Sequence, residues 1–121
     1  MRIDFDFVRI LLATIKEVQW DGGFHDLTFD DQSDYTMSLY IRLLDEAGLI
    51  DAVDYSTQDL VCWRAKWITA AGEEFLRVAE DDTCWEEAKS LVRQSYHEYT
   101  VQALAQALPQ AYRNLHARNQ R

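Results

Sequence analysis

Residues 40–50 read Tyr-Ile-Arg-Leu-Leu-Asp-Glu-Ala-Gly-Leu-Ile. The apolar residues recur at three- and four-residue steps, which predicts the end of an amphipathic helix. Gly48 stands where a residue in the left-handed conformation often closes a helix. Leu49 and Ile50 then return to the core. The stretch predicts a helix over 35–47 that stops at a glycine and leads directly into a strand.

Two short runs rich in β-branched and aromatic residues follow, at 52–55 and 60–68. The polar residues between them predict a turn, so the two runs together predict an antiparallel hairpin. Thr69 comes next, and its hydroxyl is placed to cap a helix that begins at Ala70. A helix, a two-stranded hairpin and another helix in this order are typical of a winged helix.

Helical spacing also predicts a first helix over 4–18, with either Asp4 or Asp6 as its cap. Residues 24–29 alternate loosely between apolar and polar and predict a short strand. The cap of the helix over 35–47 is expected to be Ser33 or Asp34.

A further helix is expected over 84–98, capped by Asp82 or Thr83. These elements predict a mainly helical α+β fold, a winged helix-turn-helix-like domain over 1–98 with a small antiparallel sheet and extra C-terminal helices. Residues 99–121 form a separate appendage in this interpretation.

The appendage has its own apolar pattern, which predicts an amphipathic helix that Thr100 caps and that Pro109 kinks or splits. Its own body, a second copy or another protein must cover the apolar stripe; packing on the body and dimerisation are equally favoured. The stripe is therefore a candidate interaction surface. It comprises Leu104, Leu108, Tyr112 and Leu115.

The distribution of charge along the chain indicates which class of partner it can bind. The 121 residues carry a formal net charge of -9, residues 1–60 are strongly acidic, and no acid occurs from Tyr99 onward. An acidic body repels the phosphates of nucleic acid. The less acidic end of the chain suits an acidic protein surface, such as that of a second copy.

A DNA-reading function is the alternative that the hairpin and its preceding helix suggest. Its candidate contacts are Ser38 and Arg42 on the helix and Arg64 and Lys66 on the second strand. Arg42 is the sole cation of that helix and has acids around it, so a solvated surface is favoured over a DNA reader. A third reading is an acidic mimic of DNA that inhibits a host DNA-binding complex.

Signals for chemistry are weak. There is no Gly-rich phosphate loop, nucleophile elbow or HExxH motif, so we predict no enzyme activity. Cys62, Cys84 and the scattered histidines lack metal-ligand spacing, and no cofactor is expected. With few cysteines, an acidic N-terminus and no apolar run of ~18 residues, we expect a cytoplasmic protein without a membrane partner.

The tryptophans are divided by their spacing. Trp67 and Trp85 are assigned to the core, because tryptophans at strand and helix spacing are more often core than ligand cages. Trp63 and Trp20 are the candidates for exposure.

Blocks spread over most of the chain, to about Ala88, resemble a small bacterial and phage family known as domain of unknown function 2513. The resemblance implies a winged-helix-like fold and a frequent phage or prophage setting, and it implies no activity. Ala71 departs from the family, whose members often carry an aromatic or basic residue there. The blocks are Arg2-x-Asp4-Phe5-Asp6-x-Val8-Arg9-x-x-Leu12, Leu43-Leu-x-Glu-Ala-Gly-Leu-Ile50, Ile68-Thr-x-x-Gly72-x-Glu74-Phe-Leu76 and Asp81-Asp-Thr-x-Trp85.

The sequence therefore predicts a phage-related, non-enzymatic protein-protein interaction module, and a homodimer through its last helix is one of the two arrangements left open. A DNA-binding transcriptional regulator and an acidic DNA mimic are the alternatives.

Overall fold

The computed structural model describes residues 3–18, 27, 29–95 and 99–119. Over these residues the chain forms five helices and one two-stranded antiparallel sheet, so the mainly helical α+β class is confirmed. The elements are α1 (Phe5–Val18), α2 (Asp34–Glu46), β1 (Ile50–Asp54), β2 (Trp63–Ile68), α3 (Ala70–Ala79), α4 (Asp82–Ser95) and α5 (Val101–Asn119).

Polar side chains cap most of these helices as the sequence predicts. The Asp4 carboxylate accepts from the amides of the first turn of α1, and the Ser33 hydroxyl accepts from Thr36 N at 3.1 Å. Thr69 and Thr100 cap α3 and α5 in the same way. Each cap satisfies an amide that the first turn of a helix leaves without a partner.

The cap of α4 differs from the prediction. Neither Asp82 nor Thr83 occupies it; instead, Asp81 Oδ1 accepts from the backbone amides of Thr83 and Cys84 at 2.9 and 3.1 Å. The helix begins at Asp82, two residues before the predicted start, so the residue directly before it is Asp81, whose carboxylate serves as the cap.

The sheet departs from simple alternation. β1 pairs with β2 with Ile50 opposite Ile68, and the register shifts between Asp51 and Ala52. Ala65 and Ile68, three residues apart, are therefore both buried, as expected beside an irregularity that re-aims side chains. The shift turns Trp67 outward.

The tryptophan assignments are partly wrong for this reason. Trp67 is 49% exposed and its indole donates to Asp51 Oδ2 at 2.6 Å, whereas Trp63 is half-buried against the core. Trp85 is fully buried, as predicted. Trp20 lies outside the described residues, as does most of the strand predicted over 24–29; the described Leu27 and Phe29 are not in a strand.

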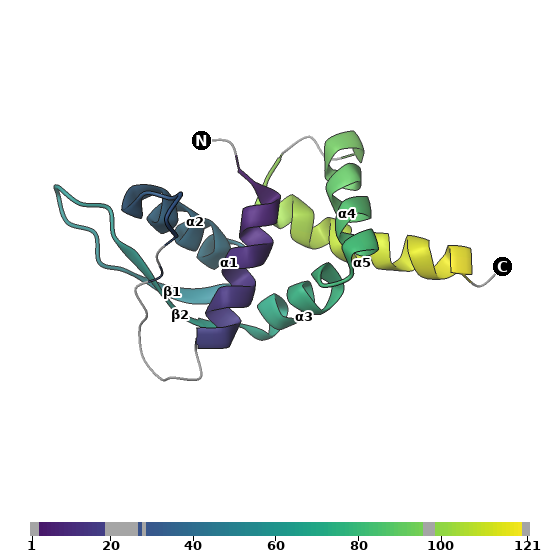
Figure 1. The fold of residues 1–121 in the computed structure, drawn as a ribbon, viewed down its shortest axis with the longest axis horizontal. Helices are drawn as coiled ribbons and strands as arrows, with labels where there is room; N and C mark the ends of the chain where they lie inside the picture. Colours follow the sequence, from purple (N-terminus) through teal and green to yellow (C-terminus); the bar gives the residue numbers. More distant parts are fainter. Residues whose placement is uncertain (1–2, 19–26, 28, 96–98, 120–121) are drawn as a thin grey trace.

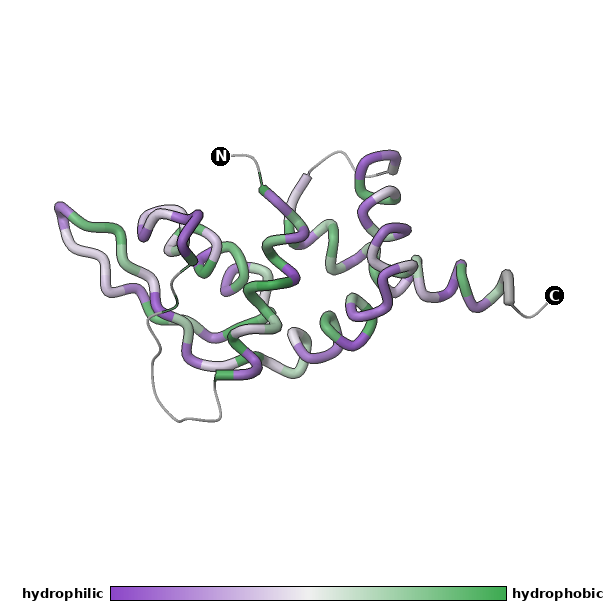
Figure 2. The backbone as a smooth tube through the Cα atoms, viewed as in Figure 1, coloured by the Kyte–Doolittle hydropathy of each residue, from purple (hydrophilic) through white to green (hydrophobic). Residues whose placement is uncertain are grey.

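The helices pack into one arrangement around a single apolar core. Figure 1 shows α2 and the hairpin at one end, α4 and the end of α5 at the other, and α1 crossing between them. Hydrophobic and hydrophilic segments alternate along the helices (Figure 2), so each helix turns an apolar side inward. The fully buried residues include Val8, Leu11, Leu12, Leu44, Trp85, Leu104 and Ala111, from four of the helices.

The final helix belongs to this core. α5 packs mainly along α4 and also against α3. It runs as one helix through Pro109, so of the two predicted effects of the proline, a kink or a split, the split is wrong. Among the described residues no helix has both the length and the apolar character required to cross a bilayer.

Candidate functional site

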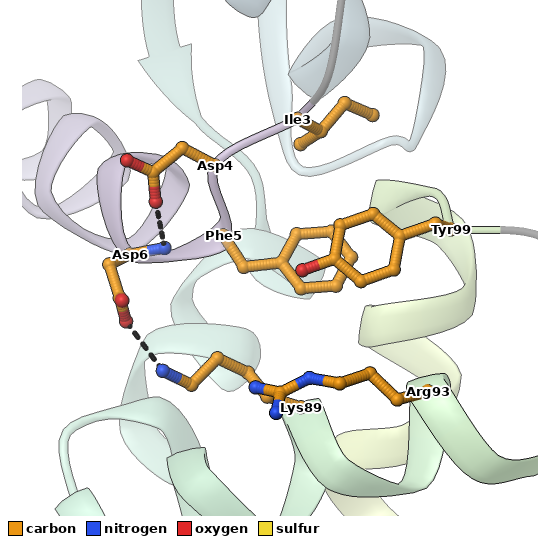
Figure 3. A pocket seen from close by; sticks show the side chains of 7 residues that line it. All are labelled: Ile3, Asp4, Phe5, Asp6, Lys89, Arg93 and Tyr99. Atoms are coloured by element: carbon orange, nitrogen blue, oxygen red, sulfur yellow. Dashed lines mark hydrogen bonds and ion pairs between the residues drawn. The ribbon is translucent and has the colours of Figure 1, made fainter.

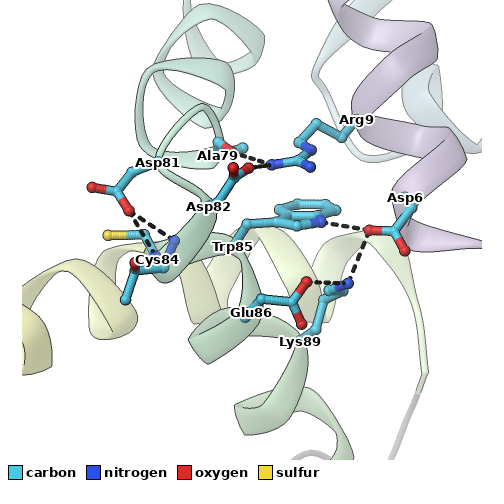
Figure 4. Close-up of polar contacts among 10 residues, drawn as sticks. Asp6, Arg9, Ala79, Asp81, Asp82, Cys84, Trp85, Glu86 and Lys89 are labelled. Carbon is cyan, nitrogen blue, oxygen red and sulfur yellow. Dashed lines mark hydrogen bonds and ion pairs between the residues drawn. The ribbon is translucent and has the colours of Figure 1, made fainter.

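A polar cluster joins the start of α1 to α4, and we call it the α1–α4 junction: Asp6, Arg9, Trp85 and Lys89. Trp85 is fully buried, and its Nε1 donates to Asp6 Oδ1 at 2.7 Å. Lys89 Nζ donates to the same oxygen at 2.9 Å (Figure 4). The buried indole N–H and the buried ammonium therefore share one carboxylate acceptor, which removes the cost of burying them unpaired.

The other side of the Trp85 ring is covered by Arg9. Its guanidinium lies 5.0 Å from the ring centroid, within cation–π range. The same group donates to the Ala79 carbonyl at 3.0 Å and to Asp82 Oδ1 at 2.9 Å. Arg9 thus ties α1 to the end of α3 and the start of α4, and the junction's polar groups find partners inside the chain.

Ionisation follows from these contacts. The hydrogen bond from Lys89, and then that from Trp85, lowers the pKa of Asp6 below its usual range. Burial opposes the charged form of Lys89, but hydrogen bonds to Asp6 and Glu86 outweigh it and raise the pKa of the ammonium. Both groups are therefore charged near neutral pH, which suits a structural ion pair and gives no proton donor or acceptor poised near pH 7.

A pocket of about 280 Å³ lies beside the junction, and the stacked rings of Phe5 and Tyr99 line it (Figure 3). Its charges are mixed, since Asp4 and Asp6 face it together with Lys89 and Arg93. The Lys89 ammonium is already bonded to carboxylates. With acids and bases balanced, this pocket has no clear preference for an anion or a cation.

A second cavity, of about 360 Å³, lies between α3 and α5, and we call it the α3–α5 groove. Its walls are largely apolar and its rim carries charges. The Arg77 guanidinium donates to Glu74 Oε2 at 3.0 Å and lies 5.6 Å from the centroid of the Tyr112 ring. The lining residues that matter below are Glu74, Phe75, Val78, Ala105, Pro109 and Tyr112.

The residues of the predicted interaction surface differ in exposure. Leu104 and Leu108 are 0% and 1% exposed within their own chain, although Leu108 lies at the base of the groove, and Leu115 is half-buried against the core. Packing on the body was the alternative left open, and α4 and α3 supply it. Tyr112, at 37% exposed, lines the groove.

Of the α5 residues that line the groove, Leu108 and Tyr112 belong to the predicted stripe, whereas Ala105, Pro109 and Arg113 were not predicted. Ala105 and Pro109 line it with Tyr112, at helical steps of four and three residues. The spacing was a usable signal, but alanine and proline are small and did not stand out beside the leucine stripe next to them.

The residues named for DNA contact have other roles or partners. Ser38 is buried, contrary to the outward position predicted for it, because its hydroxyl accepts from Trp63 N at 3.1 Å and links α2 to β2. Arg42 Nε donates to Glu46 at 2.9 Å. The charged groups of Arg64 and Lys66 lie over the rings of Tyr55 and Trp67, at 5.8 and 4.6 Å from the centroids.

No metal-binding cluster is present in the part of the chain that the structure describes: no three or more His, Cys, Asp or Glu side chains gather there as ligands. The Cys62 and Cys84 thiols are not in a disulfide, and burial raises the pKa of Cys84.

The blocks that carry the family resemblance meet in space as structural contacts. The first and last blocks supply Asp6, Arg9 and Trp85 of the α1–α4 junction. In the middle blocks, Thr69 Oγ1 donates to the Gly48 carbonyl at 2.6 Å, and a Cβ at Gly72 would lie only 2.0 Å from the Leu49 carbonyl oxygen. These residue types are therefore explained by folding, with no ligand required.

Comparison with known proteins identifies the family. Residues 2–98 match the family described as "Hypothetical protein (DUF2513)". The chain is similar to an uncharacterized protein of Haemophilus influenzae, 29% identical over 107 residues that cover 88% of this chain and 91% of that protein. No solved structure matches. Since the family match spans most of the chain and its blocks build the core contacts, this protein belongs to the DUF2513 family.

Proposed function

We propose that this protein is a winged-helix-like interaction module that acts through protein contacts and carries out no catalysis. The observation that carries the proposal is the α3–α5 groove, a largely apolar cavity of about 360 Å³ with a charged rim. Apolar concave surfaces with polar rims are typical of protein and ligand sites.

The winged-helix-like assignment has its own support. Gly48, at φ 77°, closes α2 in the left-handed conformation and directs the chain into β1. α2 packs on both strands of the hairpin and α1 packs on β2. A phage or prophage setting and a cytoplasmic location remain predictions of the sequence.

A protein partner is favoured over DNA by the surface that would read bases. Ser38 is used inside the fold, and Arg42 is paired with Glu46 on a helix that also exposes Asp34. Phosphate contacts by Lys and Arg supply most of the affinity for DNA, and a chain of net charge -9 offers few of them here.

Site-specific photo-crosslinking in cells tests the groove. A photoreactive phenylalanine analogue replaces Tyr112 in one variant and Tyr35, which is 58% exposed on α2, in the matched control. We expect discrete protein adducts from position 112 and none of comparable yield from position 35. Absence of adducts at 112, or equal adducts at both positions, contradicts the proposal.

A DNA mobility-shift experiment tests the alternative. We expect no retention of duplex DNA at moderate ionic strength by the wild-type protein. Retention that weakens with salt and disappears in an Arg64→Ala, Lys66→Ala double variant would overturn the preference for a protein partner, because those are the wing cations.

A further inference from the structure

We infer that the occupant of the α3–α5 groove is α5 of a second copy of this chain, so that two copies form a twofold dimer. The inference rests on the proposed function and names its partner. In a twofold interface the same surface is used by both copies, so one element must serve both as part of the groove and as the segment that fills the partner's groove.

The exposed side of α5 meets that requirement. Ala105, Pro109 and Tyr112 line the groove from one side of the helix, while the opposite side is buried against the body. Two of these three side chains are small, which allows a second helix to approach closely, and Tyr112 supplies an aromatic anchor. Figure 1 shows α5 reaching past α4 to the outer end of the molecule, where another copy has access to it.

The exposed sides of α3 and α5 carry complementary charges between copies, although Glu74 at the groove is already paired with Arg77. In and directly after α3, the exposed acids Glu73, Glu74 and Glu80 outnumber the single base, Arg77. α5 contains no acid and exposes Arg113 at the groove. Setting α5 of one copy against α3 of the other therefore brings opposite charges together. That local attraction orients two molecules whose net charges of -9 otherwise repel.

Sedimentation equilibrium on the purified full-length chain is the experiment. We expect a concentration-dependent dimer for the wild-type protein, and Tyr112→Asp raises the dimer dissociation constant at least about tenfold, the size typical of losing an interface anchor. Tyr35→Asp, the same change on an exposed tyrosine outside the groove, leaves the constant unchanged. Circular dichroism establishes that both variants are folded.

A second pair of variants tests the charges at the groove without removing the Tyr112 ring. Arg113→Glu, at an exposed base on the groove, weakens the dimer, while Arg93→Glu, at an exposed base of α4, does not. Equal effects of the two variants, or a dimer insensitive to both Tyr112→Asp and Arg113→Glu, overturn the inference.

Sedimentation and photo-crosslinking together distinguish a second copy from a different protein as the occupant of the groove. A wild-type protein that stays monomeric through the concentration range, but crosslinks from position 112 to a different protein, excludes the second copy and leaves the interaction module standing. Adducts between two copies of the chain at position 112, together with the dimer, support both.

Discussion

The α1–α4 junction and the α3–α5 groove make opposite use of similar residue types. At the junction, a tryptophan, two cations and a carboxylate satisfy one another, and the Trp85 ring is wholly buried. At the groove, a tyrosine, two arginines and a glutamate surround an open apolar cavity, and Tyr112 is partly exposed. The junction is closed by its own chain, whereas the groove stays open in the described structure.

The family match covers the closed junction but not the α5 wall of the open groove. Residues 2–98 belong to the matched segment and include the whole junction, but the α5 wall of the groove lies beyond residue 98. The motifs identify a scaffold because they make its internal contacts. Surfaces that select a partner need not contain any of them.

The largest expected loss of stability comes from a substitution at the centre of the junction. Trp85→Ala removes a fully buried indole and leaves Asp6 and Lys89 without one of their neighbours, so we expect a loss of about 3–5 kcal/mol in the free energy of unfolding. Urea denaturation followed by circular dichroism measures it. Trp85→Phe is the control, since it keeps a ring but loses the N–H donor, and a loss as large as that of Trp85→Ala would show that the hydrogen bond dominates.

Gly72→Ala is expected to cause the next largest loss in the free energy of unfolding. The new Cβ would lie 2.0 Å from the Leu49 carbonyl oxygen and 2.6 Å from Ile68 Cγ1, so backbone must move and we expect a loss of about 1–3 kcal/mol. Thermal unfolding of Gly72→Ala and Ala71→Gly, the neighbouring exposed position, separates the clash from a change in helix propensity. A neutral Gly72→Ala would contradict the close approach.

Local signals in the sequence predicted much of this scaffold. Ser33, Thr69 and Thr100 were identifiable as caps, and Gly48 as a helix stop, because each acts through backbone groups within a few residues. The helical periodicity of α5 was equally readable, but the burial of its leucines within the chain was not, because packing on the body and dimerisation were equally favoured.

The remaining features depend on contacts between distant segments. The burial of Ser38 follows from a hydrogen bond to Trp63 across 25 positions, and the exposure of Trp67 follows from a register shift in a strand pair. The groove needs α3 and α5 to lie side by side. Spacing within one helix gives the apolar stripe, but it does not show which side the rest of the fold covers.

A smaller, pH-dependent effect probes the charge of the junction. The pKa of Asp6 is lowered from an ordinary value of 3.8, mainly by Lys89, so the unfolded chain binds this proton more readily. The stabilisation is complete above about pH 4 and is lost as the pH falls through the lowered pKa. We expect wild type to exceed Asp6→Asn in stability at pH 6, with the gap closing toward pH 2.

The check is a series of urea titrations of both proteins between pH 6 and pH 2. Asparagine keeps an oxygen that can accept from the Trp85 indole, so the comparison isolates the carboxylate charge. A gap that stays constant down to pH 2 would show that the Lys89 contact contributes nothing through ionisation.

The smallest expected change in the free energy of unfolding is at the groove. Arg113→Ala alters an exposed side chain whose described hydrogen bond is to Gln110 on the same helix, so the free energy of unfolding of the monomer should stay within about 0.5 kcal/mol of wild type. Arg9→Ala, the same substitution at the junction, removes the donors to Ala79 and Asp82 and should cost about 1 kcal/mol. Denaturation at a low protein concentration, where any dimer has dissociated, gives both values. Equal losses would mean that the groove arginine stabilises the fold as the junction arginine does, and the distinction between a closed junction and an open groove would fail.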